Sequence, residues 1–116
     1  MKNNKKLSRG QAGIGYKVYT VLFNYNGAAF TIWELENDVG AISWSTTGTG
    51  DYLATLTGAF SGDKTVCFAG NDTTTEAVSF FSKSNNNSVS LKIRDINTGS
   101  ANGISHYISL EIRVYD

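Results

Sequence analysis

Apolar residues in this chain recur mainly at every second position, a period that is typical of β-strands and not of helices. The clearest example is YKVYTVLFNY (16–25), a run of β-branched and aromatic residues that ends at Asn26-Gly27. The Asn-Gly pair is a strong signal for a two-residue hairpin turn. No long window carries an apolar stripe at helical spacing. The period therefore predicts an all-β chain.

Turn signals rich in Gly, Asn, Ser and Thr separate the strand-like runs at intervals of about 8–12 residues. The expected strands cover residues 16–25, 28–37, 41–46, 51–57, 64–69, 76–82, 88–95 and 106–116. This spacing indicates an antiparallel β-sandwich or a jelly-roll-like barrel of about eight strands. A chain of 116 residues can bury a single core, so we expect one β domain over residues 16–116.

The charges of the chain are divided between two unlike parts. Residues 1–9 hold four bases and no acid, whereas residues 10–116 hold six bases and ten acids, so the formal charge of zero is the sum of +4 and −4. Such a basic segment on an acidic body is typical of an interaction tail, and we expect residues 1–15 to form an extended arm. The arm lacks the apolar stretch of a secretion signal, and no run is long enough to span a membrane. It also lacks an aromatic residue for base stacking, which argues against a nucleic-acid partner.

The first expected strand is apolar on both faces. Val18 and Leu22 share one face, and the other face carries Tyr19, Val21, Phe23 and Tyr25. In a two-layer sandwich, one apolar face of such a strand needs a second cover, which a neighbouring subunit can supply. We therefore expect an oligomer interface, and its assigned residues are Tyr19, Val21, Phe23 and Tyr25.

The last two expected strands, 88–95 and 106–116, each alternate one apolar face with one polar face. If these two strands pair antiparallel, Glu111 would lie across from Lys92 or Arg94, where an ion pair could form.

Residues with catalytic chemistry are few. His106 is the only histidine and Cys67 the only cysteine, and no recognisable motif surrounds either residue. Cys67 alternates with Val66 and Phe68, where a free cysteine usually behaves as a small buried hydrophobe. We therefore predict a protein without enzymatic activity or cofactor. The alternative, a small hydrolase on a sandwich scaffold, would need His106 or Glu36.

Three carboxylates in WELEND (33–38) are spaced by two residues, so a strand would place Glu34, Glu36 and Asp38 on one face. Three carboxylates on one face could hold Ca²⁺. The favoured interpretation is a solvated outer face, with Trp33 and Leu35 pointing inward.

Trp33, Trp44 and Tyr52 could form an aromatic platform for sugars. Their alternation with polar neighbours favours core positions instead. If the chain does bind a glycan, loops 70–75 and 97–103 would complete that site.

Residues 16–68 resemble a domain that recurs in structural proteins of tailed phages and prophages of the Bacteroidota. That domain has a YTALL-like strand, an L-E-N-x-L/V-G turn, a tryptophan in the next strand, G-x-Y-x-A-T-L and G-x-F-x-x-x-K-T. The matching residues here are Tyr19-Thr20-Val21-Leu22, Leu35-Glu36-Asn37, Gly40, Trp44, Gly50, Tyr52, Ala54-Thr55-Leu56, Gly58, Phe60 and Lys64-Thr65. Residues 28–33 depart from the pattern because they lack the proline that is common there. Residues 76–116 match only as generic strands.

The resemblance implies a head fibre or capsid decoration protein, made in the host cytoplasm and exposed on the virion surface. Such fibres are commonly homotrimers with the N-terminus rooted in the particle, and the resemblance provides no catalytic residues. The arm would then bind the major capsid protein or another virion protein, with bases that pair with acidic residues and glycines that let it bend. The assigned anchor residues are Lys2, Lys5, Lys6, Arg9, Gly10, Gly13 and Gly15. The alternative is a tail or baseplate module that binds a receptor or a host surface glycan.

Overall fold

The structure, a computed structural model, describes residues 15–25, 29–72, 77–95 and 106–115. Those residues contain eight strands and one short 3₁₀ turn. The elements are β1 (Tyr16–Tyr25), β2 (Phe30–Asn37), β3 (Ser43–Gly48), β4 (Asp51–Thr55), η2 (Gly62–Lys64), β5 (Thr65–Asp72), β6 (Ala77–Asn85), β7 (Ser88–Asp95) and β8 (His106–Tyr115). None of the described residues belongs to a helix that is long and apolar enough to cross a membrane.

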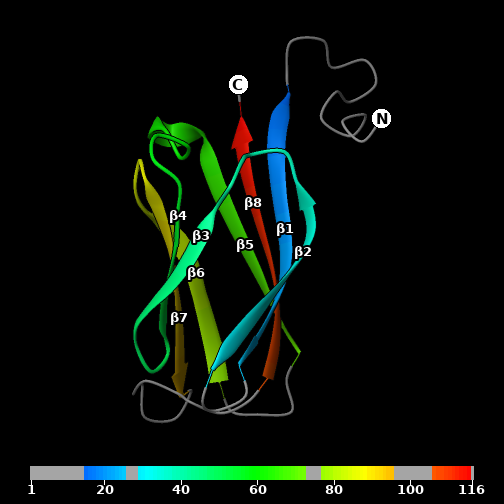
Figure 1. The fold of residues 1–116 in the computed structure, drawn as a ribbon, viewed down its shortest axis with the longest axis vertical. Coiled ribbons are helices and arrows are strands. Elements are labelled where there is room, and N and C mark those ends of the chain that lie inside the picture. The colour runs from blue at the N-terminus through cyan, green and yellow to red at the C-terminus, as the bar shows by residue number, and fades with distance from the viewer. Residues whose placement is uncertain (1–14, 26–28, 73–76, 96–105, 116) are drawn as a thin grey trace.

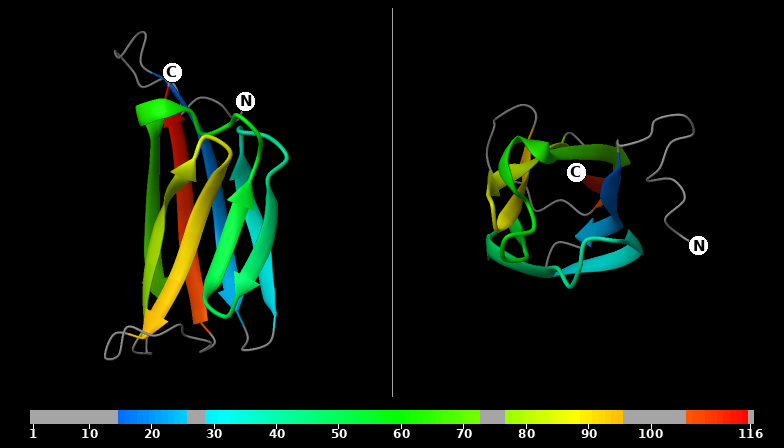
Figure 2. Two further views of the ribbon diagram at one scale, coloured as in Figure 1. Left: turned by 90° about the vertical axis from the view of Figure 1, so that its left-hand side faces the viewer. Right: turned by 90° about the horizontal axis from the view of Figure 1, so that it is seen from above.

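The strands form two four-stranded sheets with the orders β2-β1-β8-β5 and β3-β4-β7-β6, and every pair is antiparallel. The sheets face each other across the core (Figures 1 and 2). The predicted all-β sandwich is therefore confirmed. The β-strand period and the Gly- and Asn-rich turns were sufficient evidence for it.

The last two strands do not pair, so the condition for an ion pair between them is not met. β8 lies between β1 and β5, whereas β7 lies between β4 and β6 in the other sheet. Glu111 therefore lies across from Thr20 and Phe68, not from Lys92 or Arg94.

Two strands extend further than their sequences predict. β5 continues to Asp72 and β6 continues to Asn85, through polar residues that have the composition of loops. Both are edge strands of their sheets, so their backbones pair on one side only, and the exposed Ser84 and Asn85 at the end of β6 remain in contact with water.

The core fills the space between the sheets. Its fully buried large side chains are Tyr19, Val21, Phe23, Phe60, Val89, Leu91, Ile93, Ile108, Leu110 and Ile112. The Phe23 ring packs against Tyr52 with a centroid distance of 4.9 Å and against Trp44 at 5.8 Å. Because Phe23 belongs to one sheet and its two partners to the other, these aromatic contacts join the layers.

One hydrogen bond also joins the two sheets. The indole Nε1 of Trp44 donates to the Tyr19 hydroxyl at 2.8 Å. Burial raises the pKa of Tyr19, the bond from Trp44 opposes that shift, and the charge of Glu34 adds to it. The Tyr19 phenol therefore stays protonated at neutral pH and can also donate.

The sandwich has two distinct ends. Tyr16 and Tyr115 pair at one end of the β2-β1-β8-β5 sheet, while Tyr25 and His106 pair at the other. Strands β1, β5 and β7 finish at the end that holds Tyr25 and His106 (Figure 1). The chain thus enters the domain at the end opposite the one where these three strands finish.

Candidate interaction face

A β-bulge in β2 determines where the acidic residues of WELEND point. Glu34 lies opposite Val21 and Glu36 opposite Thr20, so Leu35 is the extra residue of the bulge. Residues directly opposite each other on paired strands share a face. Glu34 is therefore on the side of the buried Val21, and Glu36 is on the outer side with Thr20.

The expectation that three carboxylates share one face is consequently wrong, because the bulge reverses the alternation between Glu34 and Glu36. The described residues contain no group of three His, Cys, Asp or Glu that could hold a metal ion. Trp33 and Leu35 do not point inward either: they are 61% and 65% exposed.

The Leu-Glu-Asn part of the motif ends strand β2, and Asn37 shapes the turn that follows. The Asn37 Oδ1 atom accepts hydrogen bonds from the backbone N–H groups of Val39 at 2.9 Å and Gly40 at 3.0 Å. Gly40 has φ of +142°, and a Cβ there would lie 2.8 Å from a methyl carbon of Leu56. Asn37 and Gly40 therefore serve the chain reversal between β2 and β3, not a ligand.

The main candidate site is the outer face of the β2-β1-β8-β5 sheet, on the side away from the core. The register places together the side chains of Tyr16, Val18, Thr20, Leu22, Asn24, Thr31, Trp33, Glu36, Val66, Phe68, Gly70, Tyr107, Ser109, Glu111, Arg113 and Tyr115, with Leu35 at the bulge. We call this set the outer apolar face. Five of the six exposed large hydrophobic side chains in the described residues belong to it. Four of these five lie on the edge strands β2 and β5, on either side of the more polar β1 and β8, and so many exposed apolar side chains on one sheet face make it a candidate interaction site.

The outer face of the other sheet is different in composition. It is built mostly from hydroxylated and charged residues, namely Ser43, Ser45, Asp51, Leu53, Thr55, Val78, Phe80, Ser82, Ser90, Lys92 and Arg94. Phe80, 54% exposed, is its only exposed large hydrophobic side chain among the described residues. The outer face of this second sheet is therefore the more polar of the two outer faces of the sandwich.

Arg113 lies between two aromatic rings on the outer apolar face. Its guanidinium carbon lies 4.9 Å from the Phe68 ring centroid and 5.1 Å from that of Tyr16. Its Nε donates to a carboxylate oxygen of Glu111, and its Nη1 lies 3.4 Å from the Tyr115 hydroxyl. The contacts with Tyr115 and Glu111 raise the pKa of Arg113 above its ordinary value. Cation–π contacts and the ion pair hold this arginine flat against the sheet.

A shallow trough of about 300 Å³ lies beside this stack. Its lining residues are Thr20, Phe68, Ala69, Gly70, Ser109, Leu110 and Glu111. Gly70 leaves the floor open, since a Cβ there would approach only the Cβ of Ser109, at 3.9 Å. Two hydroxyls, a carboxylate and an aromatic edge could contact a ligand that has both polar groups and an apolar side.

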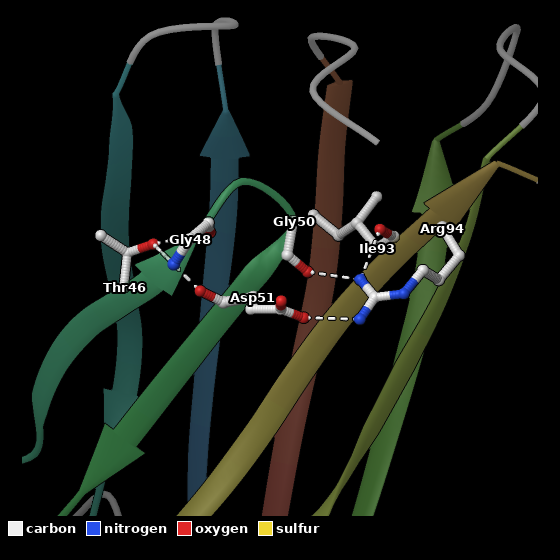
Figure 3. Close-up of polar contacts among 6 residues, drawn as sticks. All are labelled: Thr46, Gly48, Gly50, Asp51, Ile93 and Arg94. Atoms are coloured by element: carbon white, nitrogen blue, oxygen red, sulfur yellow. Dashed lines mark hydrogen bonds and ion pairs between the residues drawn. The ribbon is translucent and has the colours of Figure 1, made fainter. Parts of the chain in front are cut away.

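Arg94 makes a second polar cluster, on the other sheet (Figure 3). Its Nη2 lies 2.7 Å from Asp51 Oδ1, and its Nη1 donates to the carbonyl oxygens of Gly50 at 3.1 Å and Ile93 at 3.0 Å. These contacts tie the β3–β4 turn to β7. The Thr46 hydroxyl, which accepts the Gly48 N–H at 3.1 Å, closes the same turn. The cluster holds no nucleophile beside a base, and we assign it a structural role.

The residues assigned to an oligomer interface lie elsewhere than expected. Tyr19, Val21 and Phe23 are at most 1% exposed, because the second sheet of the same chain covers them. That assignment is corrected: these side chains are not available to a neighbouring subunit. The backbone of Tyr25 belongs to β1, but its side chain lies outside the described residues. The exposed apolar side of the sheet is the side that carries Leu22.

Of the assigned anchor residues, only Gly15 is among the described residues, and it is buried at the entrance to β1. The other six, Lys2, Lys5, Lys6, Arg9, Gly10 and Gly13, lie outside them.

Two of the three candidate aromatic residues occupy core positions, as predicted. Tyr52 is buried, and Trp44 packs against the core. A sugar platform made of Trp33, Trp44 and Tyr52 is therefore excluded, although Trp33 itself is exposed. Loops 70–75 and 97–103 lie partly or wholly outside the described residues.

Cys67 and His106 do not form a catalytic pair. Cys67 pairs with Ile112 of β8, six residues along that strand from His106, a separation of about 20 Å at the usual rise of a strand. Cys67 is partly buried against the core, and burial raises the pKa of its thiol to about 11. The prediction that Cys67 packs as a hydrophobe is confirmed. The His106 side chain lies outside the described residues.

Comparison of this chain with protein families, with curated proteins and with solved structures finds no match.

Proposed function

We propose that this chain is a structural protein of a tailed-phage particle, a head fibre or capsid decoration protein that acts without enzymatic chemistry. Residues 1–15 anchor it to the capsid, and the sandwich is displayed at the virion surface. The observation that carries the proposal is that the two ends of the domain differ. The chain enters at the end marked by Gly15 and Tyr16, whereas strands β1, β5 and β7 finish at the opposite end (Figure 1).

Charge supports the same assignment. The four bases of residues 1–9 precede a segment, residues 10–116, with a formal charge of −4. A basic arm can bind an acidic patch of a capsid protein, and the acidic domain would be repelled from that patch toward solvent. If several copies form an oligomer, such as the homotrimer that the phage resemblance implies, several arms can bind at once. Avidity then offsets the entropy lost when each arm becomes ordered.

Deletion of residues 1–15 tests the anchor. The truncated protein should fold with an unchanged far-ultraviolet spectrum, because β1 begins at Tyr16, and it should no longer bind particles that lack the native protein. A matched full-length variant with Lys2, Lys5, Lys6 and Arg9 all changed to Gln keeps the arm length and removes only its charge. This variant should bind particles weakly and lose the salt dependence shown by wild type. Undiminished incorporation of the truncated protein would refute the anchor.

A second candidate function is a tail or baseplate module that binds a receptor or a host surface glycan. The trough beside Phe68 favours it, because the Thr20 and Ser109 hydroxyls and the Glu111 carboxylate could bind sugar hydroxyls there. A glycan array with the isolated protein separates the two candidates. Binding that is lost on Phe68→Ala would favour the module, whereas a decoration protein should bind no glycan.

A further inference from the structure

We propose that the outer apolar face is the surface on which a second copy of this chain packs. This inference is independent of the virion assignment, since it rests only on the composition, exposure and charge of one sheet. The face belongs to all four strands of that sheet, and Trp33, Phe68 and Tyr107 on it are 61%, 44% and 42% exposed. A monomer in solution would leave these rings in water.

The area of the face is close to what a stable interface needs. Two strands of ten residues and two of eight, spaced by about 4.8 Å, give a flat area of roughly 600 Å², to which the relief of the side chains adds. The rings of Trp33, Phe68 and Tyr107 alone expose roughly 300 Å². Stable interfaces bury about 800 Å² on each partner. The whole sheet face, rather than a part of it, is thus the natural contact surface.

The charges of the face permit contact with an identical face. Arg113 and Glu111 form an ion pair within the chain, so their charges cancel locally. None of the described residues on the face is a lysine, and Glu36 lies on the edge strand β2. Interface centres are enriched in Trp, Tyr, Phe and Arg and depleted in Lys, and this face has the same composition.

Other occupants fit the face less well. The arm of residues 1–15 has no aromatic residue, so it offers little apolar surface to cover the exposed rings of the face. An anionic membrane would need unpaired cations, and Arg113 is paired with Glu111. A glycan could contact the trough but not Leu35 or Val66, which are 65% and 40% exposed. A second copy covers the rings and the aliphatic side chains together, with the sheets about 10 Å apart. Closed symmetry then buries every copy of the face.

The test is the mass of the full-length protein in solution, measured by light scattering after size exclusion over a hundredfold range of concentration. Wild type should have a mass that is a whole multiple, two or more, of the 12.6 kDa chain. Trp33→Ser and Phe68→Ser should each weaken the association at least tenfold. Phe80→Ser is the matched control, since Phe80 is 54% exposed but lies on the opposite face, and this variant should keep the wild-type mass.

Folding of each variant is checked by its thermal transition. Leu35→Ser provides a further variant, because the bulge leaves Leu35 without a partner across the strands, and the change should not alter the fold. Tryptophan emission gives an independent readout: dilution of wild type should shift it to longer wavelength as Trp33 enters water.

Three results would overturn the proposal. The first is a wild-type protein that is a monomer at every concentration. The second is an oligomer that persists in Trp33→Ser, Phe68→Ser and Leu35→Ser alike. The third is a monomer that binds a glycan array or anionic vesicles through Trp33, which would assign the face to a foreign partner.

Discussion

Replacing Arg94 with methionine should destabilise the domain by about 2 kcal/mol. The substitution supplies an apolar side chain of similar length and removes the contacts of the guanidinium with Gly50, Ile93 and Asp51, of which the first and the last join β7 to the β3–β4 turn and to β4. The hydrogen bond to the Gly50 carbonyl, made by a charged donor, contributes about 1.5 kcal/mol. The ion pair with Asp51 contributes about 0.5 kcal/mol, since the two side chains are 22% and 34% exposed and water screens them.

Urea unfolding followed by circular dichroism measures this loss. In a domain of about 100 residues, 2 kcal/mol corresponds to a fall of about 8–16 °C in Tm. Asp51→Asn, which removes the ion pair but keeps the bond to Gly50, should cost only about 0.5 kcal/mol. Lys92→Met is the control, because Lys92 is an exposed base on the same face of β7. The reasoning would be refuted if Arg94→Met cost no more than Lys92→Met.

Three further predictions concern the interior and the turns. Tyr19→Phe and Trp44→Phe should each cost about 1–2 kcal/mol in urea unfolding, and the double variant should cost less than their sum because the two side chains share one hydrogen bond. Gly40→Ala should cost about 1–3 kcal/mol, because of the positive φ and the 2.8 Å approach to Leu56; an unchanged urea midpoint would contradict the turn geometry. The pKa of Cys67 is raised from 9.0 to about 11 on folding, so its contribution to stability is complete below pH 9 and is lost as pH rises through about 11. Labelling of Cys67 at pH 8 should accordingly be slow in the native protein and fast in urea, and equal rates would show that the thiol is not buried.

The strands could be predicted from the sequence, but their arrangement could not. The alternation in residues 16–25 and 88–95 was sufficient to place β1 and β7 to the residue. Strand pairing depends on contacts between segments that are distant in the sequence. Both β7 and β8 have one apolar face, so their own sequences do not show that they belong to different sheets. The edge position of β5 is likewise set by the order of all four strands in its sheet. At an edge, the polar residues that end β5 can continue the strand.

The location of the candidate face could not be predicted from the sequence. Residues 16–25 are apolar on both sides of their strand, which indicated that a second cover is needed but not on which side. The sequence did not decide which side is covered by the second sheet, and the side with Tyr19 is the buried one. The bulge at Leu35 appears only in the register between β1 and β2, so the outward direction of Trp33 could not be inferred from alternation. Arg94 and Asp51 are 43 residues apart, and no short motif predicts their contact.

Mass spectrometry of purified phage particles tests the proposed function most directly. Peptides of this chain should be present in intact particles at a fixed copy number. The same peptides should be missing from particles assembled with the variant that lacks residues 1–15. Particles purified to constant composition that contain the major capsid protein but none of this chain would contradict the account.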